Sequence, residues 1–365
     1  MGNLARNTRL LAALVLALCF VASAGGTGYR EDQQILQHWN GSSWTKSNVR
    51  VPKGAIDLAA VTAISASDVW VVGTNSHGSV ADPDYWLYPL AEHWNGRLWH
   101  AMRLPTPSRG TPYAIDDISA AAPNDIWAVG GAGPAYTVIE HWNGKRWRVV
   151  PDPEPLTDLS GVAALSPHDV WLVGYLNTFK HDQTGIRMLV EHWNGRTWRR
   201  VATPHPKNRL LQSVAASSPS DIWAVGGPLL LHWNGVAWKQ VAYESPPAHR
   251  YSIDAVAALS ADDAWAVGSA GSRSLVEHWN GHRWHVVGAA SFKGSSLSAI
   301  SAVSADDIWV AGTTGNPIRP FAAHWDGKSW TVVPPKNAIG HADWVTGVAA
   351  LGRNDAWVVG STVFP

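Results

Sequence analysis

Two short stretches decide the fold of this chain: DIWAVG at residues 125–130 and HWNGKRW at residues 141–147. The first is one copy of Asp-x-Trp-x-x-Gly, whose aspartates are Asp68, Asp125, Asp169, Asp221, Asp263, Asp307 and Asp355. The second is one copy of His-Trp-Asn/Asp-Gly-x-x-Trp, which begins at His38, His93, His141, His192, His232, His278 and His324. Copies recur about every 48 residues. That period is typical of four-stranded propeller blades and exceeds that of most two-helix repeats.

Each repeat contains four strand signals separated by turn signals. A small apolar strand such as 159–165 precedes a turn that contains Pro167, and a wholly apolar strand follows at 170–173. The third and fourth strands form a hairpin around Asn-Gly, in a loop of two or four residues. Either loop places Trp142 and Trp147 on one face and His141 on the other. The sequence therefore predicts an all-β fold, a seven-bladed β-propeller with four-stranded antiparallel blades.

The ends of the chain complement each other. The chain starts with a third-and-fourth-strand hairpin at about residues 33–51 and ends with a first-and-second-strand pair at 345–360. Joined, they make one blade. Because an open ring would leave unpaired strand edges, we expect the last blade to be shared between the N- and C-terminal segments.

Residues 1–24 have the pattern of a signal peptide. Arg6 and Arg9 precede an apolar run at 10–22, and Ala-Ser-Ala at 22–24 offers a cleavage site. The run is short for a membrane span, and it contains Cys19, the only cysteine. We expect a secreted or extracytoplasmic protein whose residues 25–365 form one propeller domain without a thiol or a disulfide.

Composition and motifs exclude several classes of function. The 28 basic and 28 acidic residues create no global field for nucleic acid. Neither a phosphate-binding loop, a dinucleotide fingerprint, a zinc-protease motif nor a nucleophile elbow is present. We therefore predict no cofactor, no metal, no catalytic residue, no nucleic-acid partner and no membrane span after signal removal, and we expect a monomer.

The repeats carry a family resemblance over the whole mature chain. They resemble those of secreted bacterial seven-bladed propellers with DVWAVG and HWNGxxW motifs, seen here at 125–130 and 141–147. The strand pattern is more distantly similar to kelch and tectonin-type propellers. The resemblance implies extracellular binding of sugars or proteins in some members and glycan cleavage in others. It implies no site residue here, because neither the full kelch Gly-Gly pattern nor the Ser-x-Asp-x-Gly of Asp-box repeats is reproduced in each repeat.

Residues that recur in all seven repeats are interpreted as scaffold, since one ligand rarely needs seven copies of a contact. Of 23 Trp, 21 belong to the repeats, and Trp86 and Trp344 do not. Both fall on the variable face, where the second-to-third-strand loops and the links between blades emerge. The candidate ligand-binding residues there are Trp86, Tyr85, Tyr88, Trp344, His341 and Asp343. They either form an aromatic platform for a sugar ring or a protein, or pack their own loops.

A second group of candidates lies where the first strand begins, beside the channel mouth. Asp116, Asp254 and Gln212 share one register there, as a cation site or as solvated polar residues.

The leading hypothesis is a non-catalytic extracellular binding protein for a glycan or cell-surface polymer. The alternatives are a protein-interaction platform, and a glycoside hydrolase or lyase using carboxylates at the channel mouth. The candidate acids for the latter are Asp82, Asp84, Asp116, Asp152, Glu154, Asp158, Glu244 and Asp254. Two nearby carboxyls with raised pKa would favour the enzyme.

Overall fold

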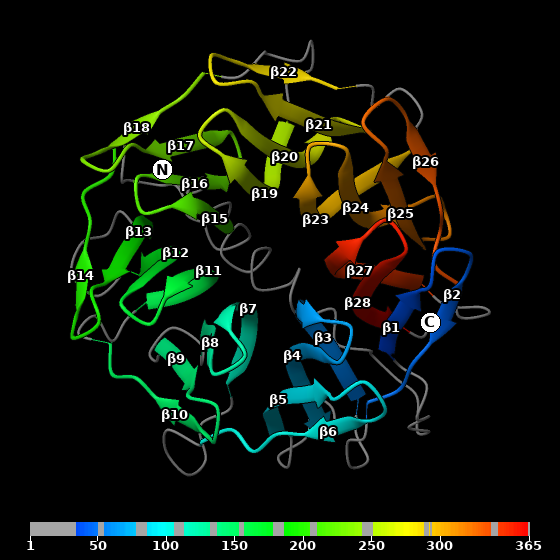
Figure 1. Ribbon diagram of the computed structural model, residues 1–365, viewed down its shortest axis with the longest axis horizontal. Helices are drawn as coiled ribbons and strands as arrows, with labels where there is room; N and C mark the ends of the chain where they lie inside the picture. Colours follow the sequence, from blue (N-terminus) through cyan, green and yellow to red (C-terminus); the bar gives the residue numbers. More distant parts are fainter. Residues whose placement is uncertain are drawn as a thin grey trace, which may run out of the picture.

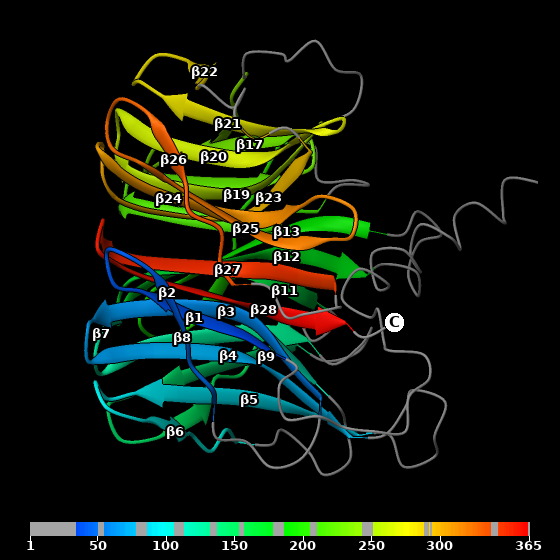
Figure 2. The same ribbon diagram turned by 90° about the vertical axis from the view of Figure 1, so that its right-hand side faces the viewer.

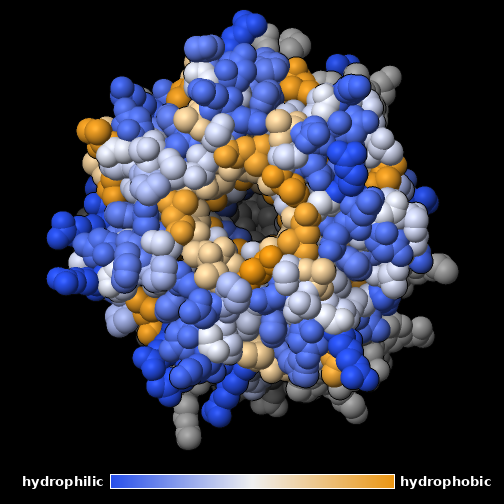
Figure 3. Space-filling model, in the orientation of Figure 1, coloured by the Kyte–Doolittle hydropathy of each residue, from blue (hydrophilic) through white to orange (hydrophobic). Residues whose placement is uncertain are grey.

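The computed structural model forms a ring of seven β-sheets (Figure 1), and the space-filling view shows the opening of a channel at its centre (Figure 3). It describes residues 34–49, 55–77, 86–105, 113–131, 137–152, 157–177, 186–204, 210–242, 251–287, 292, 294–336 and 342–363. The predicted signal peptide, residues 1–24, lies outside these ranges. All regular elements in the described ranges are strands. None of the described segments is a helix long and apolar enough to cross a membrane.

Each blade is an antiparallel sheet of four strands, numbered here from the innermost outward. Blades one to three contain β3 (Ala55–Ser65), β4 (Asp68–His77), β5 (Trp86–Trp94), β6 (Trp99–Ala101); β7 (Ala114–Ala122), β8 (Asp125–Gly131), β9 (Thr137–Trp142), β10 (Trp147–Val149); and β11 (Thr157–Ser166), β12 (Asp169–Asn177), β13 (Ile186–Trp193), β14 (Trp198–Arg200). Blades four to six contain β15 (Ser213–Ser218), β16 (Asp221–Gly226), β17 (Leu229–Trp233), β18 (Trp238–Gln240); β19 (Tyr251–Ser260), β20 (Asp263–Ala270), β21 (Arg273–Trp279), β22 (Trp284–Val286); and β23 (Ser295–Ser304), β24 (Asp307–Thr314), β25 (Arg319–Trp325), β26 (Trp330–Val332).

Blade seven joins the two ends of the described chain, as predicted. Its strand order is β27 (Ala342–Gly352), β28 (Asp355–Val363), β1 (Gln34–Trp39) and β2 (Trp44–Lys46). β1 pairs with β28 over six residues, from Gln34 opposite Ser361 to Trp39 opposite Ala356. This pairing closes the ring, so the sheet edges left by the two terminal segments are both covered.

Tryptophan clusters hold neighbouring blades together. In blade two, Trp142 and Trp147 are paired across the hairpin, and their rings lie 5.1 and 5.7 Å from Trp70 of blade one. The same arrangement recurs at Trp127, Trp171, Trp223, Trp265, Trp309 and Trp357, each contacted by two hairpin Trp of the next blade. The hairpin loop therefore has four residues, and both rings do face the adjacent blade.

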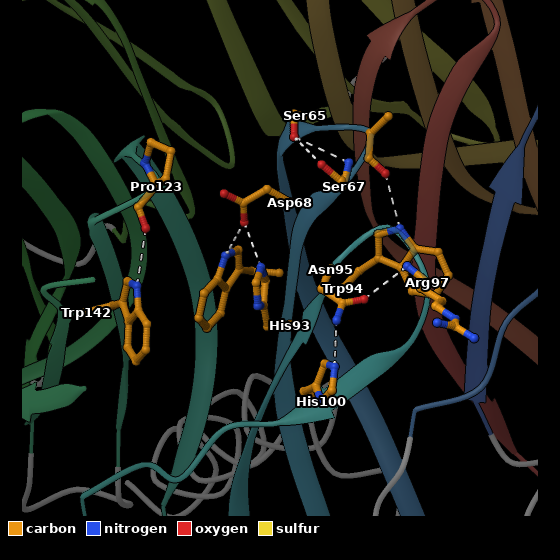
Figure 4. Close-up of polar contacts among 12 residues, drawn as sticks. Ser65, Ser67, Asp68, His93, Trp94, Asn95, Arg97, His100, Pro123 and Trp142 are labelled. Atoms are coloured by element: carbon orange, nitrogen blue, oxygen red, sulfur yellow. Dashed lines mark hydrogen bonds and ion pairs between the residues drawn. The ribbon is translucent and has the colours of Figure 1, made fainter. Parts of the chain in front are cut away.

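The repeated His and Asp lie within one blade and bind each other. In blade one, Asp68 Oδ1 accepts hydrogen bonds from Trp70 Nε1 at 2.8 Å and lies 2.9 Å from His93 Nε2 (Figure 4). His93 also stacks on Trp70, with ring centroids 4.3 Å apart. An equivalent His–Asp pair, 2.6–2.9 Å long, is present in every blade. These side chains are thus engaged in orienting the buried Trp, as expected for scaffold.

The last glycine of each Asp-x-Trp-x-x-Gly motif allows a close approach of the innermost strand. A Cβ on Gly174 would stand 2.0 Å from the backbone oxygen of Asp158, and one on Gly73 would stand 2.0 Å from that of Asp57. The five equivalent glycines face a carbonyl oxygen at 1.9–2.3 Å in the same way. No side chain fits there. One residue beyond this contact the innermost strand forms a β-bulge, as between Leu159 and Gly161.

We predict that Gly174→Ala destabilises the propeller by about 3 kcal/mol, because a backbone carbonyl must move to admit the methyl group. Gly352→Ala is the matched control, since its Cβ would meet no atom nearer than Asp307 Oδ2 at 3.8 Å. Thermal unfolding of the two purified variants measures the difference. Equal melting temperatures would show that the carbonyl contact is unimportant.

Candidate functional site at the channel mouth

The two ends of the channel have different chemistry. The first-to-second-strand turns and the third-to-fourth-strand hairpins lie at one end, on the left in Figure 2, and the innermost strands begin at the other. At the turn end each innermost strand has a second bulge, which presents mainly aliphatic residues: Ile64, Ala121, Leu165, Ser217, Leu259, Val303 and Leu351. Figure 3 shows apolar side chains around this opening. The opposite end carries the carboxyls described next.

The first bulge places one residue of each innermost strand at the mouth on the loop end. The bulged residues are Ala59, Asp116, Ser160, Asp254, Ser298 and Thr346, and Gln212 precedes β15 at the matching place. Three hydroxyls in this row donate hydrogen bonds of 2.5–2.7 Å to a carbonyl oxygen of the next blade: Ser160 to Leu211, Ser298 to Val345 and Thr346 to Leu58. The position therefore favours a hydrogen-bond donor.

Asp116 occupies this donor position with a carboxyl group. A carboxyl can donate only when it is protonated. Burial, followed by the negative charges of Asp158 and Asp117, raises the pKa of Asp116 to about 8. The side chain is half-buried in the neck of the channel, where little water can stabilise its ionised form. Its environment thus keeps Asp116 largely protonated at neutral pH.

Two further carboxyls surround Asp116. Asp117 accepts hydrogen bonds from the amides of Ile118 at 2.9 Å and Val162 at 2.8 Å, but burial outweighs them and raises its pKa to about 7. Asp158, on β11 of the next blade, accepts a 2.7 Å hydrogen bond from the Tyr175 hydroxyl. Burial raises the pKa of Asp158 despite that bond. These three residues join blades two and three in one acidic group.

The acidic group continues around the mouth in both directions. Asp57 on β3 is open to the channel, yet protein surrounds it closely enough that burial raises its pKa to about 6. Asp254, on β19 across the ring, accepts a 2.5 Å hydrogen bond from Ser252 and has a raised pKa, again through burial. We call Asp57, Asp116, Asp117, Asp158 and Asp254 the mouth carboxyls.

Trp344 belongs to the same mouth. Trp344 immediately precedes Val345, which lies opposite the motif glycine Gly360. In the same way, Asp57 immediately precedes Leu58, which lies opposite the motif glycine Gly73. The two residues therefore share a register on β27 and β3, which are adjacent innermost strands joined by the Thr346–Leu58 hydrogen bond. Trp344 is half-buried. An indole and a carboxyl thus stand at equivalent places on neighbouring blades.

The other predicted aromatic residues lie further out. Tyr88 is 52% exposed on β5, the third strand of blade one, opposite Asn75. Trp86 begins β5, opposite His77, and its side chain is outside the described part, as are Tyr85 and His341. Asp343 is buried on β27, 1% exposed. Since β5 lies two strand spacings, about 10 Å, outside the innermost strand, Tyr88 and Trp344 stand at different radii in the ring.

Sequence reasoning did not single out Asp57 and Asp117. The signal for Asp57 is an acid directly before Leu58, which faces the motif glycine Gly73. The signal for Asp117 is a second acid directly after the bulged Asp116, in a strand otherwise made of small and apolar residues. It also passed over four glutamates before the repeat His: Glu92, Glu140, Glu191 and Glu277, all fully buried. The Tyr113 hydroxyl donates to Glu140 at 3.2 Å, and burial raises the pKa of Glu140 to about 8. The equivalent Gln37 binds the backbone of Lys336, so in blades two and seven this position holds the link from the preceding blade.

The acidic groups are not arranged as a metal centre. Within the described ranges, no three His, Cys, Asp or Glu side chains converge closely enough to hold a metal ion. What the mouth does offer is partly protonated carboxyls, which both donate and accept hydrogen bonds. The indole of Trp344 lies on the innermost strand next to that of Asp57.

Comparison with known proteins places the chain by its fold. No family model matches it, and no curated protein matches it in sequence. It aligns with YCF48 bound to a D1 peptide over 94% of its length and 98% of the other chain, at 13% identity and a TM-score of 0.56. It aligns with a catalytically inactive virginiamycin B lyase from Staphylococcus aureus with quinupristin over 90% of its length and 99% of the other chain, at 11% identity and a TM-score of 0.60. It aligns with the RRP9 WD40 repeats over 93% of its length and 99% of the other chain, at 10% identity and a TM-score of 0.56. The chain is a seven-bladed propeller similar to these proteins in fold.

We predict that stability falls as pH rises from 5 to 8. The unfolded chain ionises its Asp side chains near 3.8, whereas folded Asp116 and Asp117 keep their protons to about 8 and 7, so their stabilising contribution is lost across this interval. Replacing both with Asn should remove roughly 5–10 °C of the fall in melting temperature. Asp326→Asn is the control, because hydrogen bonds from the Ser329 and Lys328 amides lower the pKa of Asp326. A double variant with the full pH dependence would contradict the assignment.

Proposed function

We propose that this protein is an extracytoplasmic binding protein that takes a glycan or cell-surface polymer at the mouth of its channel. One observation carries the proposal: the mouth carboxyls lie on four of the seven innermost strands, and the half-buried Trp344 holds the same register position as two of them, Asp57 and Asp158. A sugar ring has an apolar face that stacks on an indole and hydroxyls that both donate and accept hydrogen bonds. A mouth of partly protonated carboxyls matches the second property, and Trp344 matches the first.

Several further observations support this function. The signal-peptide pattern at residues 1–24 supports export. The rigid ring of interlocked Trp fixes the innermost strands, so the mouth is pre-organised and a ligand orders few groups on binding. Structures of similar fold have been described with a bound D1 peptide and with quinupristin, which supports the propeller as a scaffold for binding.

We predict that Trp344→Ala weakens glycan binding at least tenfold, by roughly 1.4 kcal/mol or more, through loss of the stacking surface. A glycan array with the secreted wild-type protein identifies the ligand, and titration of that glycan measures the effect. Trp344→Phe keeps a ring and should retain most of the affinity. Both variants are first checked for wild-type melting temperature.

Tyr88→Ala is the matched control for this experiment. Tyr88 is an exposed aromatic residue on the same side of the blade but two strands further out. Its loss should change the affinity less than twofold. If Tyr88→Ala abolishes binding and Trp344→Ala leaves it unchanged, the ligand site lies on the outer loops and the mouth is not the site.

One observation favours a second function, a glycoside hydrolase or lyase. Asp116 and Asp158 lie close enough to interact electrostatically, and both have a raised pKa. A carboxyl that stays protonated near neutral pH can protonate a leaving group, and a neighbouring carboxylate can act as base. This enzyme would release new reducing ends or unsaturated sugars from a bound polymer. Asp116→Asn would abolish release but preserve binding that depends on Trp344. Binding without any release over a broad polysaccharide panel would eliminate this function.

A further inference from the structure

The hairpins at the outer circumference are strongly basic in a chain of balanced charge. From the Asn or Asp of each hairpin to the second residue after its last Trp, the seven segments contain eleven Lys or Arg and a single acid, Asp326. The whole chain has 28 of each sign. The eleven, all exposed, are Lys46, Arg97, Lys145, Arg146, Arg148, Arg196, Arg199, Arg200, Lys239, Arg283 and Lys328. The hairpins at the circumference, which we call the rim, are thus rich in positive charge, whereas the channel mouth is rich in carboxyl groups.

The positive charge is densest on two adjacent blades. Blade two contributes Lys145, Arg146 and Arg148, and blade three contributes Arg196, Arg199 and Arg200. We call these six residues the basic sector. Figure 1 places β10 and β14, with the hairpins that precede them, side by side on the circumference. Arg148 lies opposite His141 and Arg199 opposite His192, so the two arginines hold equivalent positions on the face of the hairpin away from the Trp pair.

The basic sector lacks nearby counter-charges among the described residues. The eight acids described in blades two and three are all buried or half-buried: Asp116, Asp117, Asp125, Glu140, Asp152, Asp158, Asp169 and Glu191. Asp125 and Asp169 are bound to His141 and His192 at 2.7 and 2.8 Å, which turns them away from the rim. In blades five and six, by contrast, the turns carry exposed Asp262 and Asp306 beside the hairpins. Within the described part of blades two and three, no exposed acid therefore offsets the positive field of the sector.

We propose that the basic sector binds an extended anionic polysaccharide, at a site separate from the channel mouth. Five of its six cations are Arg, whose planar fork pairs with a carboxylate or sulfate through two parallel hydrogen bonds. The sector runs along the circumference from one blade to the next, so a linear polymer can meet both sets of charges. The Trp rings of these hairpins pack inward against the neighbouring blade and leave no stacking platform of the kind that single-stranded nucleic acids use.

The test compares charge-matched double variants of the full secreted chain. Arg148→Gln with Arg199→Gln removes two charges from the sector. Arg273→Gln with Arg319→Gln removes two exposed charges at the start of β21 and β25, at the opposite end of the blades. Affinity for heparin and for polygalacturonate is measured against salt concentration. The sector variant should bind at least about tenfold more weakly at low salt, with a slope of log affinity against log salt smaller by about two. The control variant should match the wild type.

Each outcome decides the proposal. Loss in the sector variant alone supports it, and a loss for only one of the two polymers identifies the sulfate or the carboxylate as the charged group. Equal binding by the sector variant and the wild type, or equal loss in both variants, overturns it. Tighter binding of duplex DNA than of either polysaccharide assigns the sector to nucleic acid and also overturns it. Trp344→Ala should retain heparin binding, which separates this site from the proposed mouth site.

Discussion

The fold depends on the clasp that two hairpin tryptophans of one blade make around a tryptophan of the blade before it. Twenty-one of the 23 Trp serve this contact, and each clasp packs three large rings together at a seam between sheets. Every other repeated residue supports it. Asn-Gly turns the hairpin so that both rings emerge on one side, and the His–Asp pair fixes the orientation of the clasped ring.

The motif glycine connects this scaffold with the candidate site. Because the innermost strand passes with its carbonyl directly over Gly130 and Gly174, it bulges in the next residues. The bulge releases one residue per blade from the ladder and directs it toward the channel mouth. In most blades that residue is small or a hydroxyl that bonds the next blade. In blades two and five the bulged residue is an aspartate, Asp116 or Asp254, and the pKa of each is raised.

The architecture could be predicted from the sequence alone because the same two motifs recur in every repeat, so each copy supports the same assignment. Seven copies of two motifs establish the blade number, and the order of motifs at the two ends predicts the shared blade, which β1 and β28 confirm. The mouth was harder to predict. Asp116 and Asp254 could be aligned, but the proximity of Asp158 to Asp116 comes from packing between blades that no period in the sequence encodes. Asp57 and Asp117 sit in strands of ordinary composition, and only the bulge register reveals what they face. Tyr85, His341 and the side chain of Trp86 fall outside the described part of the chain, so their proposed role stays a prediction.

The shared blade also sets an order of events in synthesis. β1 is among the first strands made, yet its partner β28 lies more than 300 residues further along the chain, so β1 and β2 wait without a sheet until the C-terminal segment exists. Contacts that remote in sequence form slowly, since a long loop must close before they contribute any stability. A ring of this kind cannot close while the chain is still being made. The same pairing that seals the finished ring therefore keeps the ring open until the last strands have been synthesised.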